Sequence, residues 1–407
     1  MRIVFATDCY SEGMGYSENI LPRVLAALGH EVFIVSSTMQ VYGDCQFYDQ
    51  VYQDFLGHSV VAEGQQVIDG VTLIRLPILL WWKRFKIAKG KTRLILALKP
   101  DIVYAWDPRA YQTVMLSLVS YFSSFKLFSA IHTVASVYPA YYSFQDWSFL
   151  KRIYLRLTDT LLGWIASRRI SMCYATTPDA VDIGVRFFGL SQKHIKRLPL
   201  GLDTNLFFPC RVKTDYIQRV KLRSELGIEL HEIVCIYTGR LTEGKNPYCL
   251  ALAIEALRKE GYSFRAIFLG AGEQGEKIAV TDGCLLKSFI PYSKLRVYYH
   301  AADIGVWPCQ ESISMMDAAA CGLPIVVSNR MMSIERIEGN GLTYEENDYL
   351  DLARVLRQLE DIQLRIKLGN CGADKMRNTF DITHVADIIL NDFKSAFSHT
   401  APAKRVA

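Results

Sequence analysis

Short apolar runs and longer amphipathic stretches alternate along the whole chain. The apolar runs are bounded by turn residues, which is typical of strands buried on both faces of a sheet. The stretches between them repeat apolar residues three and four positions apart, which is typical of helices with one buried face. Strands and helices that alternate in this way predict an α/β fold built on parallel sheets.

The predicted strands fall into two series. An amphipathic helix closed by Gly29 separates the first two strands of the first series, and the second series begins at about His231. Two such series predict two Rossmann-like domains in tandem, with an interdomain cleft as the default ligand site. The strands are predicted at RIVFAT, HEVFIVSS, VTLIRLP, DIVYAW, LFSAIHT and SMCYATT, and then at IVCIYTG, FRAIFLG, LLKSFI, IGVWP and PIVVS.

This division sets the expected domain boundaries. We expect a first, acceptor-side domain over 1–197, a connector over 198–225 and a second, donor-side domain over 226–380. A last amphipathic helix is predicted over 381–397, and the polar residues 398–407 are predicted to be disordered.

Composition excludes several classes of protein. Half of the 407 residues are hydrophobic and 21% are charged, which excludes a disordered chain. A net charge of +5 is too weak to indicate binding to nucleic acid. The ten cysteines are scattered, as expected for reduced core residues rather than for disulfides or a zinc site.

The chain shows neither a signal peptide nor an apolar stretch long enough to span a bilayer, which takes about 20 residues. We therefore expect a cytoplasmic protein.

Two cations follow the first strand of the second series. In IVCIYTGRLTEGKNP, Arg240 and Lys245 lie in the loop at the carboxyl end of the strand, where open α/β sheets bind ligands. A guanidinium and an ammonium group together suit a diphosphate. Alternatively, the loop is merely charged and solvated, and from this loop alone that is the better interpretation.

A serine-rich turn and a short helix follow a later strand, in WPCQESISMMDAAACGLPIVVSN. Ser312 and Ser314 are suited to cap a helix whose N-terminus favours a phosphate. Asp317 on that helix could accept hydrogen bonds from ribose hydroxyls, and Glu311 could do the same for a hexose. Alternatively, the serines are plain caps and Asp317 only complements the helix dipole, and for Asp317 the two interpretations have equal weight.

These motifs resemble those of the family 4 retaining glycosyltransferases of GT-B fold. The similarity to the donor-binding domain lies in GRLTEGKNP, LGAGEQ, AADIGVWPCQES and DAAACGLPIVVSN, and LPLGLDTNLFFP resembles the interdomain phrase. In the first domain, GMGYSENILPRVLAALGHEV, KPDIVYAWDP and AIHTV resemble the acceptor-side landmarks. The resemblance implies an α/β GT-B fold whose last helix crosses back onto the first domain.

The resemblance also implies a reaction. It implies that a hexosyl or N-acetylhexosaminyl group moves from a UDP- or GDP-linked sugar to a glycan or lipid-linked acceptor, with retention at the anomeric carbon. It places His132 at the histidine that touches the transferred sugar, and Gly15 in the loop close to the donor phosphates. The implied catalytic residues are His132, Glu311, Arg240 and Lys245, and the implied donor-binding residues are Gly15, Arg240, Lys245, Glu311, Ser312, Ile313, Ser314 and Asp317.

The two acids depart from the family pattern. The family usually places seven residues between them, which would put the first acid at Cys309, whereas only residues 312–316 separate Glu311 from Asp317. Either the loop is shortened and Glu311 orients the sugar, which we favour, or that role is altered. Without the resemblance, we would interpret His132 as a hydrogen-bonded histidine at the end of a strand.

The sequence contains no D-x-D triad and no His or Cys cluster with metal-ligand spacing. Arg240, Lys245 and the helix N-terminus would then neutralise the leaving diphosphate. We therefore expect a metal-independent enzyme without a cofactor, for which the nucleotide sugar is a substrate.

A basic and aromatic segment, LLWWKRFKIAKGKTRLIL, suits an anionic membrane surface. A solvated helix face whose aromatic residues pack inward is an alternative of equal weight. A second stretch, LKRIYLRLTDTLLGWIASRRI, repeats the mixture more weakly. The residues expected to face the membrane are Trp81, Trp82, Lys83, Arg84, Lys86 and Lys89.

The favoured hypothesis is a retaining glycosyltransferase of polysaccharide, lipopolysaccharide or glycolipid synthesis, peripheral on the cytoplasmic face of a membrane. Hinge closure would bring the donor and acceptor together. One alternative is a nucleotide-sugar-binding protein without transfer activity, which the displaced acid suggests. Another is a GT-B epimerase or a dehydrogenase, and the incomplete glycine fingerprint at Gly270, Gly272 and Gly275 argues against the dehydrogenase.

Overall fold

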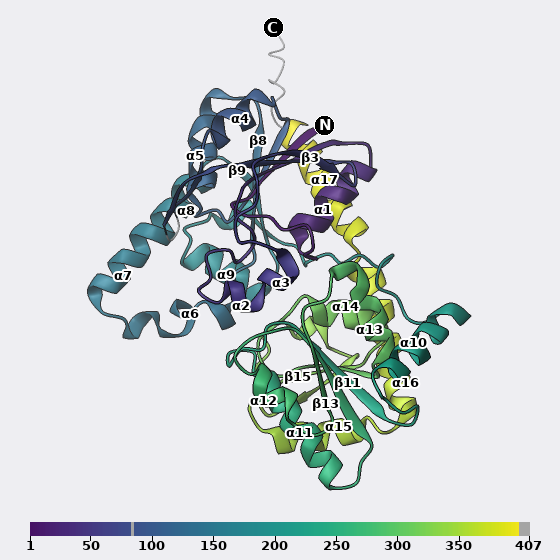
Figure 1. Cartoon of the computed structure of the whole chain (residues 1–407). Coiled ribbons are helices and arrows are strands. Elements are labelled where there is room, and N and C mark those ends of the chain that lie inside the picture. Colours follow the sequence, from purple (N-terminus) through teal and green to yellow (C-terminus); the bar gives the residue numbers. More distant parts are fainter. Residues whose placement is uncertain (83–84, 399–407) are drawn as a thin grey trace.

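The computed structural model describes residues 1–82 and 85–398, and it contains two α/β units (Figure 1). Lys83, Arg84 and residues 399–407 of the predicted disordered tail lie outside the described residues.

An eight-stranded sheet forms the first unit, in the order β10-β9-β8-β7-β1-β2-β4-β3. All neighbouring strands are parallel except β3, which pairs antiparallel with β4. The strands are β1 (Arg2–Ala6), β2 (Glu31–Ser37), β3 (Gly64–Ile68), β4 (Val71–Leu76), β7 (Ile102–Trp106), β8 (Lys126–Ile131), β9 (Ile170–Ala175) and β10 (Ile195–Arg197).

A six-stranded, wholly parallel sheet forms the second unit, in the order β13-β12-β11-β14-β15-β16. Every predicted strand is present, and the sequence analysis missed the less apolar β3, β10 and β16 as well as a hairpin described below. The strands are β11 (Ile233–Thr238), β12 (Phe264–Leu269), β13 (Cys284–Lys287), β14 (Ile304–Trp307), β15 (Ile325–Ser328) and β16 (Gly341–Tyr344).

Helices cover both sheets, and several begin with local signals that the sequence carries. Thr177, Asp348 and Asp361 each accept a backbone N–H from the first turn of the helix that follows. The first unit contains α1 (Ser17–Ala27), α2 (Tyr48–Val51), α3 (Gln53–Leu56), α4 (Lys91–Ala97), α5 (Tyr111–Val119), α6 (Ala140–Ser143), α7 (Phe149–Leu155), α8 (Leu161–Ser167) and α9 (Pro178–Arg186). The rest of the chain contains α10 (Lys213–Glu225), α11 (Pro247–Lys259), α12 (Gly275–Ala279), α13 (Leu295–Ala301), α14 (Ser314–Ala320), α15 (Tyr349–Gln358), α16 (Ile362–Thr379) and α17 (Ile382–Ser398).

The last helix, α17, packs on the first unit although α16 before it packs on the second (Figure 1). Its buried face includes Phe393, whose ring lies edge-on to that of Phe128 at 4.5 Å between centroids. Its Asp392 accepts hydrogen bonds from Tyr174 and from Lys196, 3.0 and 2.9 Å away. The chain therefore crosses between the units twice, and α17 fastens its end to the first sheet.

The connector region contains a long helix. Helix α10 packs against α13, and its Arg219 and Arg223 pair with the carboxylate of Asp303. The second half of 198–225 therefore packs as part of the second unit.

The aromatic part of the basic and aromatic segment forms a β-hairpin, β5 (Ile78–Trp82) and β6 (Phe85–Ala88), and the last part of the segment lies in α4. The helical alternative is therefore wrong for the aromatic residues, although it holds for the last part. The indole of Trp81 donates to Asp44 at 2.9 Å, and the ammonium of Lys86 lies 3.3 Å from the same carboxylate. Lys91 is buried, donates to the carbonyl of Thr7 at 2.6 Å and lies 3.7 Å from the carboxylate of Asp8, both just after β1. Three groups of the expected membrane segment are thus bound to the protein itself.

No helix among residues 1–82 and 85–398 combines the length and apolarity needed to cross a bilayer.

Candidate active site

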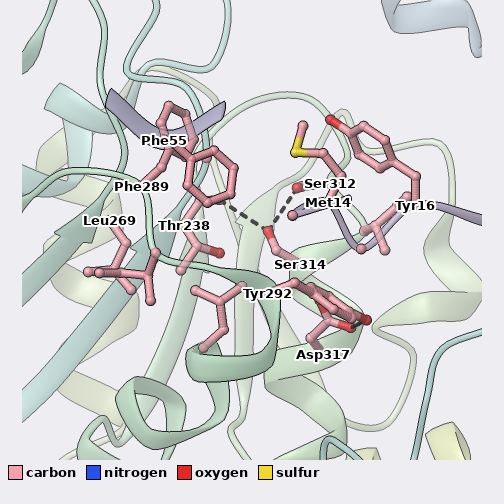
Figure 2. Close-up of a pocket in the computed structure, with 16 residues that line it drawn as sticks. Met14, Tyr16, Phe55, Thr238, Leu269, Phe289, Tyr292, Ser312, Ser314 and Asp317 are labelled. Carbon is pink, nitrogen blue, oxygen red and sulfur yellow. Dashed lines mark hydrogen bonds between the residues drawn. The ribbon is translucent and has the colours of Figure 1, made fainter. Parts of the chain in front are cut away.

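A cavity of about 170 Å³ lies between the units, at the carboxyl ends of β11 and β12 (Figure 2). The second unit supplies most of its wall, from Thr238 and Leu269 at the two strand ends and from the start of α14. The first unit covers it with the loop 13–16 after β1 and with Phe55 of α3. Loops that follow parallel strands meet at one edge of each sheet, and the cavity lies where these two edges meet.

Asp317 lines this cavity from α14 and is only 2% exposed (Figure 2). Burial raises the pKa of its carboxyl group to about 8, although the hydroxyl of Tyr292 donates to it at 3.2 Å. The carboxyl group therefore keeps acceptor capacity that the protein does not use.

Gly15 lies where the first unit approaches Tyr292 most closely. A Cβ atom at this position would lie 2.1 Å from the Tyr292 ring, so no larger residue fits without a shift of the loop. Gly15 lines the cavity together with Met14 and Tyr16. The sequence carried no signal for its partner Tyr292.

The predicted capping role of Ser312 and Ser314 is wrong. Helix α14 begins at Ser314 after Ile313, and no side chain caps it. The two hydroxyls lie 2.8 Å apart, and that of Ser314 also donates to the carbonyl of Thr238 at 3.1 Å. Because the hydroxyls bond to each other and to the carbonyl of Thr238, neither caps the backbone N–H groups of the helix. All three residues 312–314 nevertheless line the cavity.

Lys245 reaches the loop before α14. Its ammonium group donates to the backbone carbonyl of Glu311 at 2.7 Å. Burial, followed by the charge of Arg240, lowers the pKa of Lys245 to about 8. Arg240 itself is exposed, and its guanidinium lies 5.6 Å from the ring centre of Tyr42 in the first unit. Both cations therefore lie at the edge of the second sheet that faces the first unit.

The side chain of Glu311 joins the two units. One carboxylate oxygen accepts from the hydroxyl of Ser136, 2.9 Å away in the loop after β8, and the other accepts from the backbone N–H of Met332 at 3.2 Å. Glu311 lines a second cavity of about 710 Å³, together with Ser136 and Tyr142 of the first unit. The structure therefore places Glu311 and Asp317 in the walls of two different cavities.

His132 follows β8 directly and is exposed. It lines neither of the two cavities above, but it belongs to the same loop as Ser136, which touches Glu311. Within the described residues, no group of three His, Cys, Asp or Glu side chains is placed to hold a metal ion.

Two protein-family models match the sequence. One, described as Glycosyltransferase Family 4, matches residues 21–206, and the other, described as Glycosyl transferases group 1, matches residues 232–361. Together they cover more than three quarters of the chain.

Relatives with assigned names match parts of the chain. It is 29% identical over 240 residues to a D-inositol 3-phosphate glycosyltransferase of Xylanimonas cellulosilytica, a match that covers 54% of this chain and 56% of the relative. It is 26% identical over 250 residues to a mannosylfructose-phosphate synthase of Agrobacterium fabrum, with 56% and 53% covered. The matches thus span little more than half of each relative.

Solved structures match nearly the whole fold. A sucrose-phosphate synthase from Thermosynechococcus elongatus superposes with a TM-score of 0.73 at 15% identity, over 98% of this chain and 100% of that one. The Anabaena protein HepE, solved with UDP, superposes with a TM-score of 0.69 at 16% identity, over 97% and 100%. These matches confirm the GT-B fold predicted from the sequence. The two family models establish that the chain belongs to the family 4 glycosyltransferases.

Proposed function

We propose that the chain is a retaining glycosyltransferase that moves a hexose-type sugar from a UDP- or GDP-sugar to a glycan or lipid-linked acceptor. The observation that carries the proposal is that one edge of the second sheet presents the buried, under-used carboxyl group of Asp317 in the cavity wall and the half-buried ammonium group of Lys245 in the loop after β11. HepE, which shares the fold, is described in complex with UDP and with UDP-glucose. Family membership adds sugar transfer with retention.

The cavity suits the nucleoside part of the donor. Asp317 at its wall would accept hydrogen bonds from the vicinal ribose hydroxyls. Phe289 and Leu269 supply apolar surface against which a base can pack, and Phe289 is fixed in turn by Tyr52, with 5.4 Å between ring centroids. This small cavity, with the buried acid Asp317 in its wall, therefore fits a nucleoside better than it fits an apolar ligand.

The diphosphate would lie against Lys245 and Arg240. Lys245 is half-buried near the cation Arg240, and its ammonium group donates to the backbone carbonyl of Glu311. A bound anion would add to the charge compensation of Lys245. These cations would stabilise the leaving diphosphate without a metal ion.

Glu311 and His132 are proposed to contact the transferred sugar. The hydrogen bond from Ser136 to Glu311 brings the loop that contains His132 against the second unit. The side chains of His132 and Glu311 therefore belong to the interface between the units, where a sugar would meet its acceptor. A cytoplasmic location, peripheral on a membrane surface, is part of the proposal, and in the hairpin the exposed Trp82 and Lys89 support it.

Arg240→Ala and Lys245→Ala should each lower donor turnover by at least tenfold while the fold survives. Each variant removes a charge-assisted contact worth about 1.5–3 kcal/mol. The assay follows release of the nucleoside diphosphate from a panel of UDP- and GDP-sugars. Lys259→Ala, which removes an exposed cation from α11, is the matched control and should turn over normally. Unchanged donor affinity in both site variants contradicts the diphosphate assignment, and donor binding with no turnover in the wild type favours a binding protein.

The affinity for a nucleoside diphosphate, relative to that for the bare nucleoside, should fall as the pH rises above about 8. The lowered pKa of Lys245 means that its ammonium group is charged below that pH and loses its proton above it. Both ligands carry the ribose, so the titration of Asp317 cancels in the ratio. Calorimetry between pH 6.5 and 9.5 should show a loss of up to about tenfold per pH unit. Lys245→Arg stays charged and should flatten the profile, and a flat wild-type profile would contradict the assignment.

Asp317→Asn and Glu311→Gln should separate nucleotide binding from use of the sugar. Asp317→Asn should weaken binding of the free nucleotide, because the ribose contact does not need the sugar. Glu311→Gln keeps an oxygen for the N–H of Met332 and should leave nucleotide binding intact while it slows turnover of the full donor. Calorimetry with the free nucleotide and with the donor measures both. Equal losses in the two variants would show that the roles are wrongly divided.

Transfer should persist in excess chelator, because protein cations neutralise the leaving group. The measurement compares turnover after dialysis against EDTA with turnover in added magnesium or manganese. Strict dependence on the added ion would overturn metal independence.

A further inference from the structure

Two phenylalanine rings, one from each unit, close the apolar end of the cavity that contains Asp317. Phe55 of α3 and Phe289, which follows β13, lie with 5.8 Å between their ring centroids, and we call these two rings the aromatic wall. Both rings line the cavity, and Figure 2 shows them on the side opposite Asp317. Since Asp317 is proposed to bind the ribose, the aromatic wall is the part of the cavity that a base would meet.

A stack of rings from the first unit holds Phe289 in place. Tyr52, between α2 and α3, stacks on Phe289 with 5.4 Å between centroids and 19° between ring planes. Tyr42 stacks on Tyr52 in turn, at 4.8 Å and 16°, and its hydroxyl group is hydrogen-bonded to that of Tyr16 at 2.8 Å. Because Tyr52 is only 3% exposed and packed on both faces, Phe289 cannot turn toward it to make room for a larger ligand.

Phe55 is backed by the loop that follows β1. In that loop Ser11 donates to the side chain of Gln40 at 2.6 Å, and Gln40 donates in turn to the carbonyl of Leu56 at 2.8 Å. Both Ser11 and Gln40 are buried, so these hydrogen bonds fix the end of α3 next to Phe55. A Cβ atom on Gly13 would already contact the Phe55 ring, 3.4 Å away. Both rings of the aromatic wall are therefore held in place before a ligand binds.

The cavity that the aromatic wall closes is small. Its volume of about 170 Å³ lies below the range of about 300–1,000 Å³ that is usual for ligand pockets. The part of this volume next to Asp317 would take the ribose, so less than the whole is left for the base. A pyrimidine has one ring and a purine has two fused rings, and a close-packed wall admits additional atoms only with strain.

We propose that the aromatic wall restricts the donor to a pyrimidine nucleotide, so that the sugar is carried by uridine diphosphate rather than by guanosine diphosphate. The inference rests on the proposed function, because it takes a nucleotide sugar to be the donor. The base packs against the two rings, as flat apolar groups do against aromatic side chains. Through Phe55 the first unit takes part in the choice of donor, although the proposed ribose and diphosphate contacts belong to the second unit.

The far end of the ring stack lies beside a cation. The guanidinium of Arg240 is 5.6 Å from the ring centre of Tyr42. The ring that supports the aromatic wall and the ring beside the cation proposed for the diphosphate thus belong to one stack. One set of rings therefore positions groups for both ends of a nucleotide, which supports a nucleotide over an isolated apolar ligand in this cavity.

The test measures, by calorimetry on the full chain, the affinities for UDP, CDP, GDP and ADP. All four ligands carry the same ribose and diphosphate, so the ratios between their affinities isolate the base. The wild type should bind UDP and CDP more tightly than GDP and ADP by about tenfold or more, since even one methylene group in an apolar pocket is worth about 10- to 200-fold.

Variants of the aromatic wall should relax this preference. Phe55→Ala opens the wall and should raise the affinity for GDP and ADP relative to UDP by about tenfold. Tyr52→Leu removes the ring that supports Phe289 and should shift the preference in the same direction. Phe47→Ala is the matched control, because it removes a 55% exposed ring of the same segment that does not line the cavity, and it should keep the wild-type preference. Thermal unfolding with and without UDP checks that each variant is folded.

Three outcomes overturn the inference. They are a wild type that binds the purine nucleotides as tightly as the pyrimidine nucleotides, a Phe55→Ala variant that changes all four affinities by the same factor, and a shift in Phe47→Ala as large as that in Phe55→Ala. Binding of none of the four would contradict the proposed function and this inference with it, whereas equal binding of all four contradicts only the inference, so the two failures are distinguishable.

Discussion

The carboxyl edges of the two parallel sheets face one another, and the site depends on this arrangement. The loop after β1 meets Tyr292, which follows β13, and the loop after β8 meets Glu311, which follows β14. In parallel βα units these loops all lie at one edge, so two facing edges create one boundary lined by loops from both units. Helix α17 holds the boundary together, because the end of the second unit's chain is buried in the first unit's core.

This boundary is dry enough to change the chemistry of its ionisable groups. Burial moves the pKa of Asp317 up and that of Lys245 down, both to about 8. These pKa shifts mean that burial disfavours the charged form of each side chain more than the surrounding protein groups stabilise it. A ligand with hydroxyl donors at one end and negative charge at the other would satisfy both. The same burial that disfavours each charge in the free protein would thus favour a nucleoside diphosphate at this edge of the second sheet.

The sequence predicted the sheets well because buried parallel strands are continuous apolar runs. It missed β3, because this exposed edge strand carries no such run. It missed the β5–β6 hairpin although Ile78–Trp82 is an apolar run, because these residues were assigned to a membrane-facing segment. It located Asp317, Gly15 and residues 312–314 at one cavity from motif order. It predicted the wrong role for Ser312 and Ser314, and it did not predict that Tyr292 donates to Asp317 or that Ser136 donates to Glu311. The acceptor that a hydroxyl binds depends on which groups the tertiary fold brings close to it.

The position of the Glu311 side chain depends on both units. Its carboxylate accepts hydrogen bonds from the backbone N–H of Met332 in the second unit and from the hydroxyl of Ser136 in the first. Because each unit donates one of these hydrogen bonds, the carboxylate keeps this position only while the carboxyl edges of the two sheets stay together. In a glycosyltransferase with such a site, orientation of the sugar by Glu311 would then depend on closure of the cleft, whereas the ribose contact from Asp317 would not.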